Sequence, residues 1–225
     1  MNETGKPAWF VTGTDTEVGK TFVACALLHA LRRDGSTALG MKPVAAGFDA
    51  AGKNEDVEQL IAASSLLAPP ALVNPYAFRA AIAPHIAAAE EGRPIELANI
   101  VAAFEQLRGL ADAVLVEGVG GFCVPLGADI DTADLAVALD LPVILVVGMR
   151  LGCINHALLS AQAIAARGLQ LAGWVANRID PAMARFEENL AALQERIDAP
   201  LLGVVPYGAT PETAALALRL PEQAF

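Results

Sequence analysis

The sequence predicts an α/β fold in which a mostly parallel sheet is flanked by helices on both faces. Short runs rich in valine, isoleucine and leucine alternate along the chain with longer segments rich in alanine and leucine. This alternation indicates β-α-β units, which build parallel sheets. Several short runs are continuously apolar, as expected of parallel strands covered on both faces. The 225 residues contain no obvious linker, repeat or low-complexity tract, so we expect a single domain over residues 1–225.

In chain order, the short runs WFVT, TALGMK, AVLVE, PVILVV, GWVAN and LGVV predict strands, and the segments between them predict helices. The predicted strands span residues 9–12, 37–42, 113–117, 142–147, 173–177 and 202–205. The predicted helices span residues 20–33, 56–64, 95–108, 131–139, 154–167 and 183–197. The stretch 68–79 is punctuated by proline, and we expect it to wrap the surface.

The composition excludes several classes of protein. Hydrophobic residues make up 55% of the chain and charged residues 18%, so the chain can bury a large core. It contains no apolar run long enough to cross a bilayer, and its polar start, MNETGKPAWF, does not resemble a signal peptide. A formal net charge of −10 argues against nonspecific binding to nucleic acid or anionic membranes.

The cysteines indicate a reduced compartment. Cys25, Cys123 and Cys153 are widely spaced, and no CxxC pair occurs. This pattern argues against a disulfide framework and against a zinc site. We therefore expect a soluble, cytoplasmic protein.

Polar residues and glycines gather where the predicted strands end. In open parallel sheets, ligands bind outside the carboxyl ends of the strands. The residues at these ends are Thr12-Gly13, Lys42-Pro43, Glu117-Gly118, Gly148, Asn177 and Pro206-Tyr207. The sequence therefore predicts a polar site above an apolar sheet.

Residues 12–21, TGTDTEVGKT, lie between a predicted strand and a predicted helix, which is the context that a phosphate-binding loop requires. Backbone N–H groups and the helix dipole favour an anion there, with Lys20 near the β- and γ-phosphates and Thr21 on Mg²⁺. Thr14 stands where the usual spacing has glycine, which indicates a variant class of loop. The alternative is a tight turn with a solvated lysine. The motif in its context predicts a P-loop NTPase-like fold that binds ATP.

A magnesium site needs further oxygen ligands, usually one or two carboxylates. Glu117 ends the apolar run AVLVE before the glycine-rich GVGG, and Asp56 opens a predicted helix. For Glu117 the alternative is a strand-end charge in solvent. For Asp56 taken alone, an ordinary acid at a helix N-terminus is the simpler interpretation.

At this point the strings TGTDTEVGKT, KPVAAG, VNPYAF, PHIAAAEEGRPI, LVEGVGG, PVILVVGMRLGCINHALL, LAGWVAN and PLLGVVP can be taken together. In this order and spacing the chain closely resembles the dethiobiotin synthetase family over residues 8–212. The resemblance implies conversion of 7,8-diaminononanoate, CO₂ and ATP into dethiobiotin, ADP and phosphate. It implies a carbamate, then a carbamic–phosphoric anhydride, and closure of a cyclic urea by the second amine.

In this chemistry the carbamate anion attacks the negatively charged γ-phosphate, so the site must neutralise charge and align the two reactants. By resemblance, Lys20 holds the phosphates, Lys42 stands over the carbamate and the transferring phosphoryl group, and Thr16 joins the catalytic set. Periodicity alone would equally allow Lys42 to be a surface lysine. Glu17 either faces an ammonium group or belongs to the metal shell. The implied magnesium ligands are Thr21, Asp56 and Glu117.

Later strand ends are implied to bind the base. Asn177 can offer its amide to the adenine edge, and Pro206, Tyr207 and Gly208 resemble the next base-contact loop. For Pro206 the alternative is ordinary loop chemistry, and for Glu212 a plain helix-start acid. The residues implied to bind the nucleotide are Glu17, Val18, Gly19, Lys20, Thr21, Phe22, Asp56, Glu117, Gly118, Val119, Gly120, Asn177, Arg178, Pro206, Tyr207, Gly208 and Glu212.

Residues 151–155 match the family segment whose backbone amides, at a helix start, hold the substrate carboxylate across the interface of a homodimer. Cys153 is expected to be a packed residue rather than a nucleophile, because nothing basic lies beside it in sequence. His29, His85 and His156 are assigned no chemistry. The implied substrate contacts are Thr16, Lys42, Ala46, Gly152, Cys153, Ile154 and Asn155.

Three positions depart from the family pattern. Ala46 stands where many members have a serine near the diamine, which removes one hydrogen bond worth about 0.5–1.5 kcal/mol net. Asn189 stands where some relatives have a tyrosine that contacts the substrate carboxylate. Arg178 stands where an acidic residue is sometimes found. These departures affect the expected substrate affinity, not the class of reaction.

Other functions remain as alternatives. A partition- or septum-type ATPase shares this fold, but it carries a signature lysine near the place of Asp15 and often ends in a basic helix, whereas the tail here is not basic. A cobyrinic-acid-type amide synthase needs a glutaminase half, for which 225 residues leave no room. The third alternative is an inactive nucleotide-binding relative.

Overall fold

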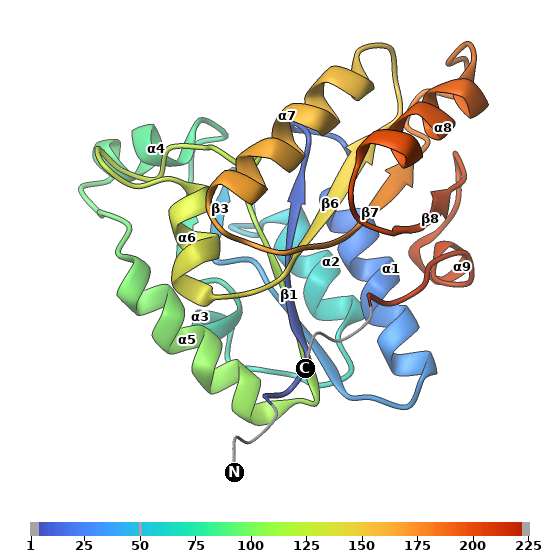
Figure 1. Cartoon of the computed structure of the whole chain (residues 1–225). Coiled ribbons are helices and arrows are strands. Elements are labelled where there is room, and N and C mark those ends of the chain that lie inside the picture. Colours follow the sequence, from blue (N-terminus) through green and yellow to red (C-terminus); the bar gives the residue numbers. More distant parts are fainter. Residues whose placement is uncertain (1–4, 50, 222–225) are drawn as a thin grey trace.

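A six-stranded sheet runs through the middle of the protein (Figure 1). The computed structural model describes residues 5–49 and 51–221. In spatial order the strands are β2 (Ala38–Met41), β5 (Ala113–Glu117), β1 (Ala8–Gly13), β6 (Val143–Gly148), β7 (Leu171–Asn177) and β8 (Leu201–Val205). All neighbouring pairs in this sheet are parallel, which confirms the predicted topology and the six predicted strands.

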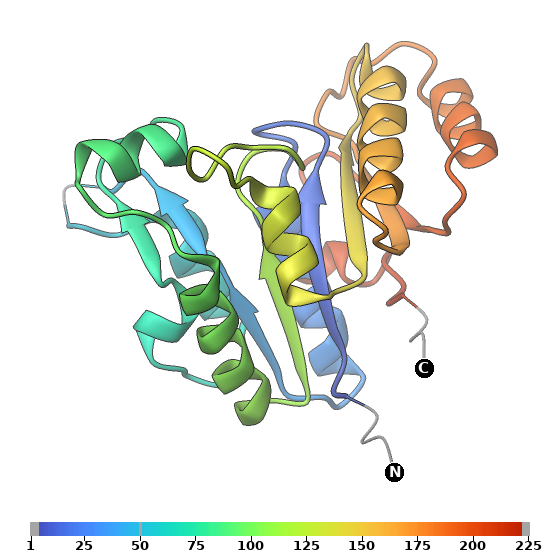
Figure 2. The ribbon, with the colours of Figure 1, turned by 60° about the vertical axis from the view of Figure 1, so that its left-hand side comes forward.

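Helices cover both faces of the sheet, as the sequence predicts. One face carries α1 (Lys20–Arg33), α2 (Glu55–Ala63) and the short α9 (Pro211–Ala214). The other carries α5 (Leu97–Leu110), α6 (Thr132–Leu139), α7 (Cys153–Ala166) and α8 (Phe186–Arg196). Figure 2 shows these two layers on either side of the strands. Within the described ranges, no helix is both long and apolar enough to cross a membrane.

The central strand β1 shows why these runs are continuously apolar. Successive side chains of a strand point to opposite faces of the sheet. Phe10 packs into the cluster beneath α5 and α6, whereas Trp9 and Val11 pack into the cluster beneath α1. All six residues of β1 are buried. Both faces therefore need apolar side chains, and their burial is the main favourable term for the fold.

A small second sheet corrects one expectation. The stretch 68–79 does not simply wrap the surface: it forms α3 (Pro70–Val73) and β4 (Tyr76–Phe78), and β4 pairs in parallel with β3 (Val44–Ala46). Val73, Tyr76 and Phe78 are buried. Together with α4 (Pro84–Glu90), these segments stand beside the main sheet in cyan and green (Figure 2). Strands of three residues carry too little periodicity to be detected against the prolines.

The element boundaries position the polar residues at the edge of the sheet. Strand β2 ends at Met41, so Lys42 lies just beyond it rather than within a strand as predicted. Helix α2 begins at Glu55, and the side chain of Asn54 caps it by accepting a hydrogen bond from the backbone N–H of Val57 at 3.2 Å. Asp56 therefore lies in the first turn of α2, facing the same edge as Lys42.

Candidate active site

A cavity of about 790 Å³ lies at the carboxyl edge of the sheet, beside the ends of β1, β2 and β5. It brings together predicted residues that lie far apart in the chain. Those that line it are Thr16, Glu17, Gly19, Lys20, Thr21, Lys42, Ala46, Asp56, Glu117, Val119 and Gly120. Val18, Phe22 and Gly118, also predicted, do not line this cavity. The position agrees with the general rule for ligand sites in parallel sheets.

The phosphate loop is anchored at both ends. The backbone N–H of Thr14 donates to the carbonyl of Val146 on β6 at 3.0 Å. Gly19 closes the loop at the start of α1 with φ +84°, a left-handed conformation that glycine adopts without steric cost. Glu17 has φ +60° without being glycine, so its backbone is held in a sparsely populated conformation by the loop around it.

Lys20 is turned into the cavity and is 7% exposed. Its ammonium donates to the backbone carbonyl of Asp15 at 2.9 Å, so the loop itself holds the side chain. Burial, followed by repulsion from Lys42, lowers the pKa of Lys20 from 10.5 to about 8. A cation placed this way is available to a polyphosphate, whose negative charge would favour the protonated form.

Lys42 lies at the centre of a buried charge cluster and is 3% exposed. Its ammonium is 2.9 Å from Asp56 Oδ2 and 2.5 Å from Glu117 Oε1. The hydroxyl of Thr21 donates to the same Glu117 oxygen at 2.8 Å. Residues from α1, α2 and the ends of β2 and β5 thus meet at one point. A single ammonium lies there between two carboxylates.

The charges in this cluster support one another. Burial alone lowers the pKa of Lys42, but the attraction of Glu117 and Asp56 outweighs it, so that this pKa is raised. For Asp56, burial acts to raise the pKa, but the neighbouring Lys42 ammonium outweighs it and the pKa is lowered. Both groups are therefore charged at neutral pH, and Lys42 is not a snorkelling surface lysine.

The cluster also fits a magnesium ion. Glu117 Oε2 is buried and has no hydrogen-bond partner among the described residues, which leaves one carboxylate oxygen free to bind a cation. Thr21 and Asp56 add a hydroxyl and a second carboxylate beside it. In the described ranges there is no group of three or more His, Cys, Asp and Glu side chains placed to hold a metal. Two carboxylates and a hydroxyl suit an ion that also binds phosphates and water.

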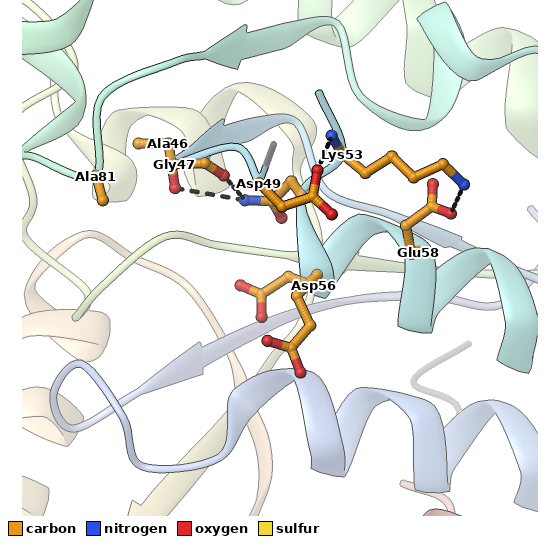
Figure 3. A pocket seen from close by; sticks show the side chains of 9 residues that line it. Ala46, Gly47, Asp49, Lys53, Asp56, Glu58 and Ala81 are labelled. Atoms are coloured by element: carbon orange, nitrogen blue, oxygen red, sulfur yellow. Dashed lines mark hydrogen bonds and ion pairs between the residues drawn. The ribbon is translucent and has the colours of Figure 1, made fainter. Parts of the chain in front are cut away.

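A second cavity of about 640 Å³ shares Ala46, Asp56 and Ala81 with the first. Figure 3 shows the carboxylates of Asp49 and Glu58 beside it, together with Asp56. The side-chain amide of Asn54 donates to the carbonyl of Gly47 at 2.8 Å and so ties β3 to the start of α2. The surroundings of the site on this side are strongly acidic.

The residues expected to bind the base lie outside the first cavity, along the ends of β7 and β8. The buried amide of Asn177 donates to the carbonyl of Val18 at 2.9 Å, so its NH₂ group supports the phosphate loop. The guanidinium of Arg178 stacks on Phe186 at 4.9 Å. Pro206, Tyr207 and Gly208 are exposed, and the Glu212 carboxylate lies 3.4 Å from His29.

Residues 151–155 also lie outside the first cavity, at the start of α7. Gly152 has φ +94° and precedes the helix, and Asn155 is exposed in its first turn. Cys153 is 2% exposed and packs with Met149 and Ala157. Burial raises the pKa of its thiol, as expected of a packed residue rather than a nucleophile.

The structure adds residues that the sequence did not single out. Ala81, Ile82, Ala83, Pro84 and Val124 complete the lining of the first cavity. The string PHIAAAEEGRPI could have indicated part of this wall, because it includes Pro84. A further addition is the ion pair between Asp15 in the phosphate loop and Arg150. No local sequence pattern predicts this pair.

Comparison with known proteins agrees with this geometry. The model of a family described as "AAA domain" matches residues 8–213. ATP-dependent dethiobiotin synthetase BioD of Aromatoleum aromaticum is 68% identical over 95% of this chain and 97% of that protein. The protein of the same name from Xylella fastidiosa is 55% identical over 94% of this chain and 96% of its own length.

Solved structures of lower identity show the fold. The septum site-determining protein MinD from Pyrococcus horikoshii superposes with TM-score 0.52 at 18% identity, covering 88% of this chain and 81% of that one. Chloroplast FtsY from Physcomitrella patens superposes with TM-score 0.58 at 16% identity, covering 94% of this chain but 62% of that one. The predicted P-loop NTPase-like α/β fold is confirmed. The close relatives go further than fold, and by its identity to them along nearly its whole length the chain belongs to the family of ATP-dependent dethiobiotin synthetases.

Proposed function

We propose that this protein is a dethiobiotin synthetase that uses ATP to close a cyclic urea on 7,8-diaminononanoate with CO₂. One amine takes up CO₂ as a carbamate and loses a proton. A carbamate oxygen attacks the γ-phosphorus and breaks its bond to ADP. The second amine then attacks the carbonyl carbon and expels phosphate. The observation that carries this proposal is the convergence of Lys20, Lys42, Thr21, Asp56 and Glu117 on one cavity, in a chain 68% identical to a protein named for this activity.

The two lysines supply the positive charge that the reaction needs. The attacking carbamate and the phosphoryl group are both anions, so an enzyme must offset their repulsion and hold them in line. Lys20, at the start of α1, binds the phosphates. Lys42, fixed by two carboxylates, faces the carbamate and the transferring phosphoryl group. Thr16, at the cavity wall, contacts the amine end of the substrate.

Thr21, Asp56 and Glu117 would hold the magnesium ion of MgATP. When bound, the ion neutralises charge on the phosphate oxygens. The free oxygen of Glu117 and the nearby Thr21 hydroxyl support this assignment. Asn177 and Arg178 contact the base from the end of β7, residues 206–208 from the end of β8, and Glu212 from α9.

We also propose that the protein works as a homodimer in the cytoplasm, with the 225 residues as one catalytic domain. Residues 152–155 then bind the substrate carboxylate across the interface, through amides at the start of α7. Exposed apolar side chains near this helix support the proposal: Leu151 is 94% exposed and Leu159 is 56% exposed. Ala46 and Asn189 leave this substrate fewer side-chain hydrogen bonds than the family pattern offers.

ADP release tests the proposal. Purified protein is given MgATP and bicarbonate, with and without 7,8-diaminononanoate. We expect ADP release to depend on the diamine. ATP hydrolysis that is indifferent to the diamine would favour a switch ATPase instead, and the absence of nucleotide binding would indicate an inactive relative.

A further inference from the structure

The carboxylate of Asp15 lies inside the phosphate loop, where a second anion is expected to bind. One of its oxygens accepts a hydrogen bond from the backbone N–H of Thr16 at 2.8 Å. The other accepts from the guanidinium of Arg150 at 2.6 Å. The backbone carbonyl of Asp15 meanwhile accepts the hydrogen bond from Lys20. This residue therefore links the loop backbone, the phosphate-binding lysine and a cation from a distant part of the chain.

Arg150 is well placed to act as a fixed counter-ion. It follows Met149, whose backbone N–H donates to the carbonyl of Asn177 at 2.8 Å. Its own carbonyl accepts from the N–H of Cys153 at 3.0 Å, in the turn that leads into α7. The preceding residue is thus held by β7 and the carbonyl of Arg150 by the turn into α7, and the Arg150 side chain bonds Asp15, 135 positions earlier in the sequence.

We propose that Asp15 and Arg150 form a positioning pair for nucleotide binding, an inference that rests on the proposed function. Arg150 neutralises a carboxylate of the phosphate loop that would otherwise repel the triphosphate. Neither side chain lines the cavity or touches the reacting groups. Both are somewhat under half exposed, at 42% and 44%, so the direct strength of the pair is small. The pair affects ATP affinity because removing Arg150 leaves the negative charge of Asp15 without compensation.

Four variants test the pair: Arg150→Gln, Arg150→Lys, Asp15→Asn and the double variant. In Arg150→Gln an uncompensated carboxylate remains in the phosphate loop near the nucleotide, and we expect the Kd and KM for MgATP to rise roughly tenfold while kcat changes little. Arg150→Lys keeps the charge and stays near wild type. In the double variant the carboxylate is gone as well, so ATP affinity is restored. A purely structural role of Arg150 in the turn before α7 would not be rescued by a change at Asp15.

Calorimetry of ATP binding, with steady-state kinetics, provides the readout. Arg196→Gln is the matched control, because Arg196 forms a comparable exposed pair with Glu195 at 3.0 Å on α8. Melting temperatures report whether each variant is folded. If Arg150→Gln binds ATP like wild type, or if Asp15→Asn fails to rescue it, the pair has no positioning role while the proposed function stands. A wild-type protein that binds no ATP overturns both.

Discussion

At the scale of single residues, the site depends on how Lys42 is held. A buried cation is costly unless opposite charges and hydrogen bonds compensate it. Here Asp56 and Glu117 both compensate it, and they come from two different elements. The arrangement keeps the ammonium protonated and fixes its position. It is therefore organised before the substrate arrives, which is what electrostatic catalysis requires.

Replacing this lysine gives the first prediction. Lys42→Met keeps the length of the side chain and removes its charge. We expect turnover to fall roughly 10²- to 10³-fold, the usual effect of losing one group that stabilises developing charge, while MgATP still binds. Steady-state assays and calorimetry measure the two effects. Lys53→Met is the control, since Lys53 pairs with Glu58 at the exposed surface. Turnover of Lys42→Met within tenfold of wild type would remove Lys42 from the mechanism.

The second prediction concerns pH. Burial and then repulsion from Lys42 lower the pKa of Lys20 from 10.5 to about 8 in the free protein. Because the lowered pKa brings deprotonation to lower pH, Lys20 is charged below about pH 8 and loses its charge above it. ATP affinity should therefore decline as the pH rises through 8. In Lys20→Arg the guanidinium stays protonated, so the affinity that remains should not show this decline. Calorimetry across this pH range would contradict the assignment if wild-type affinity stayed constant.

At the scale of elements, the start of α2 places Asp56. Asn54 caps this helix through its side-chain oxygen and ties it to β3 through its NH₂ group. We expect Asn54→Ala to lower the free energy of unfolding by about 0.5–2 kcal/mol. Asn54→Asp retains the cap and loses the donor to the carbonyls of Ala46 and Gly47, so it should cost less than Asn54→Ala. Urea unfolding measures both.

The same helix provides the control. Gln59 makes an exposed hydrogen bond to Glu55 at 3.0 Å, so Gln59→Ala should change stability by no more than about 0.5 kcal/mol. If Asn54→Ala were as stable as this control, the cap would not contribute. We also expect Asn54→Ala to raise the KM for MgATP, because a displaced α2 shifts Asp56.

The elements also show what the sequence can and cannot predict. The six strands of the main sheet were predictable because each contains a short run rich in apolar residues, and several of these runs are continuously apolar. Lys42 and Glu117 could be expected together because each lies where a strand of a parallel sheet ends. Asp56 joined them only through the family resemblance, because an acid at a helix start is by itself ordinary. The strands β3 and β4 were missed because three residues are too few to show the alternation of side chains that indicates a strand. The pair of Asp15 and Arg150 was missed because it depends on side-chain packing between segments 135 positions apart.

At the scale of the whole molecule, the proposed dimer gives the fourth prediction. Leu159 is exposed on α7, the helix whose start is proposed to bind the substrate carboxylate across the interface. Leu159→Glu should shift the protein toward monomer and raise the KM for the diamine roughly tenfold or more, while ATP affinity stays near wild type. Sedimentation and kinetics test this together. Leu67→Glu is the control, because Leu67 is 90% exposed and lies outside α7. A fully active monomer would refute the shared site.

The measurement that tests the central claim most directly follows carbon from bicarbonate into product. The protein is incubated with MgATP, 7,8-diaminononanoate and ¹³C-bicarbonate, and the products are resolved by mass spectrometry. We predict a product that has gained one labelled carbonyl and lost two hydrogens relative to the diamine, formed in step with ADP. ADP formed without any labelled product would contradict the assignment.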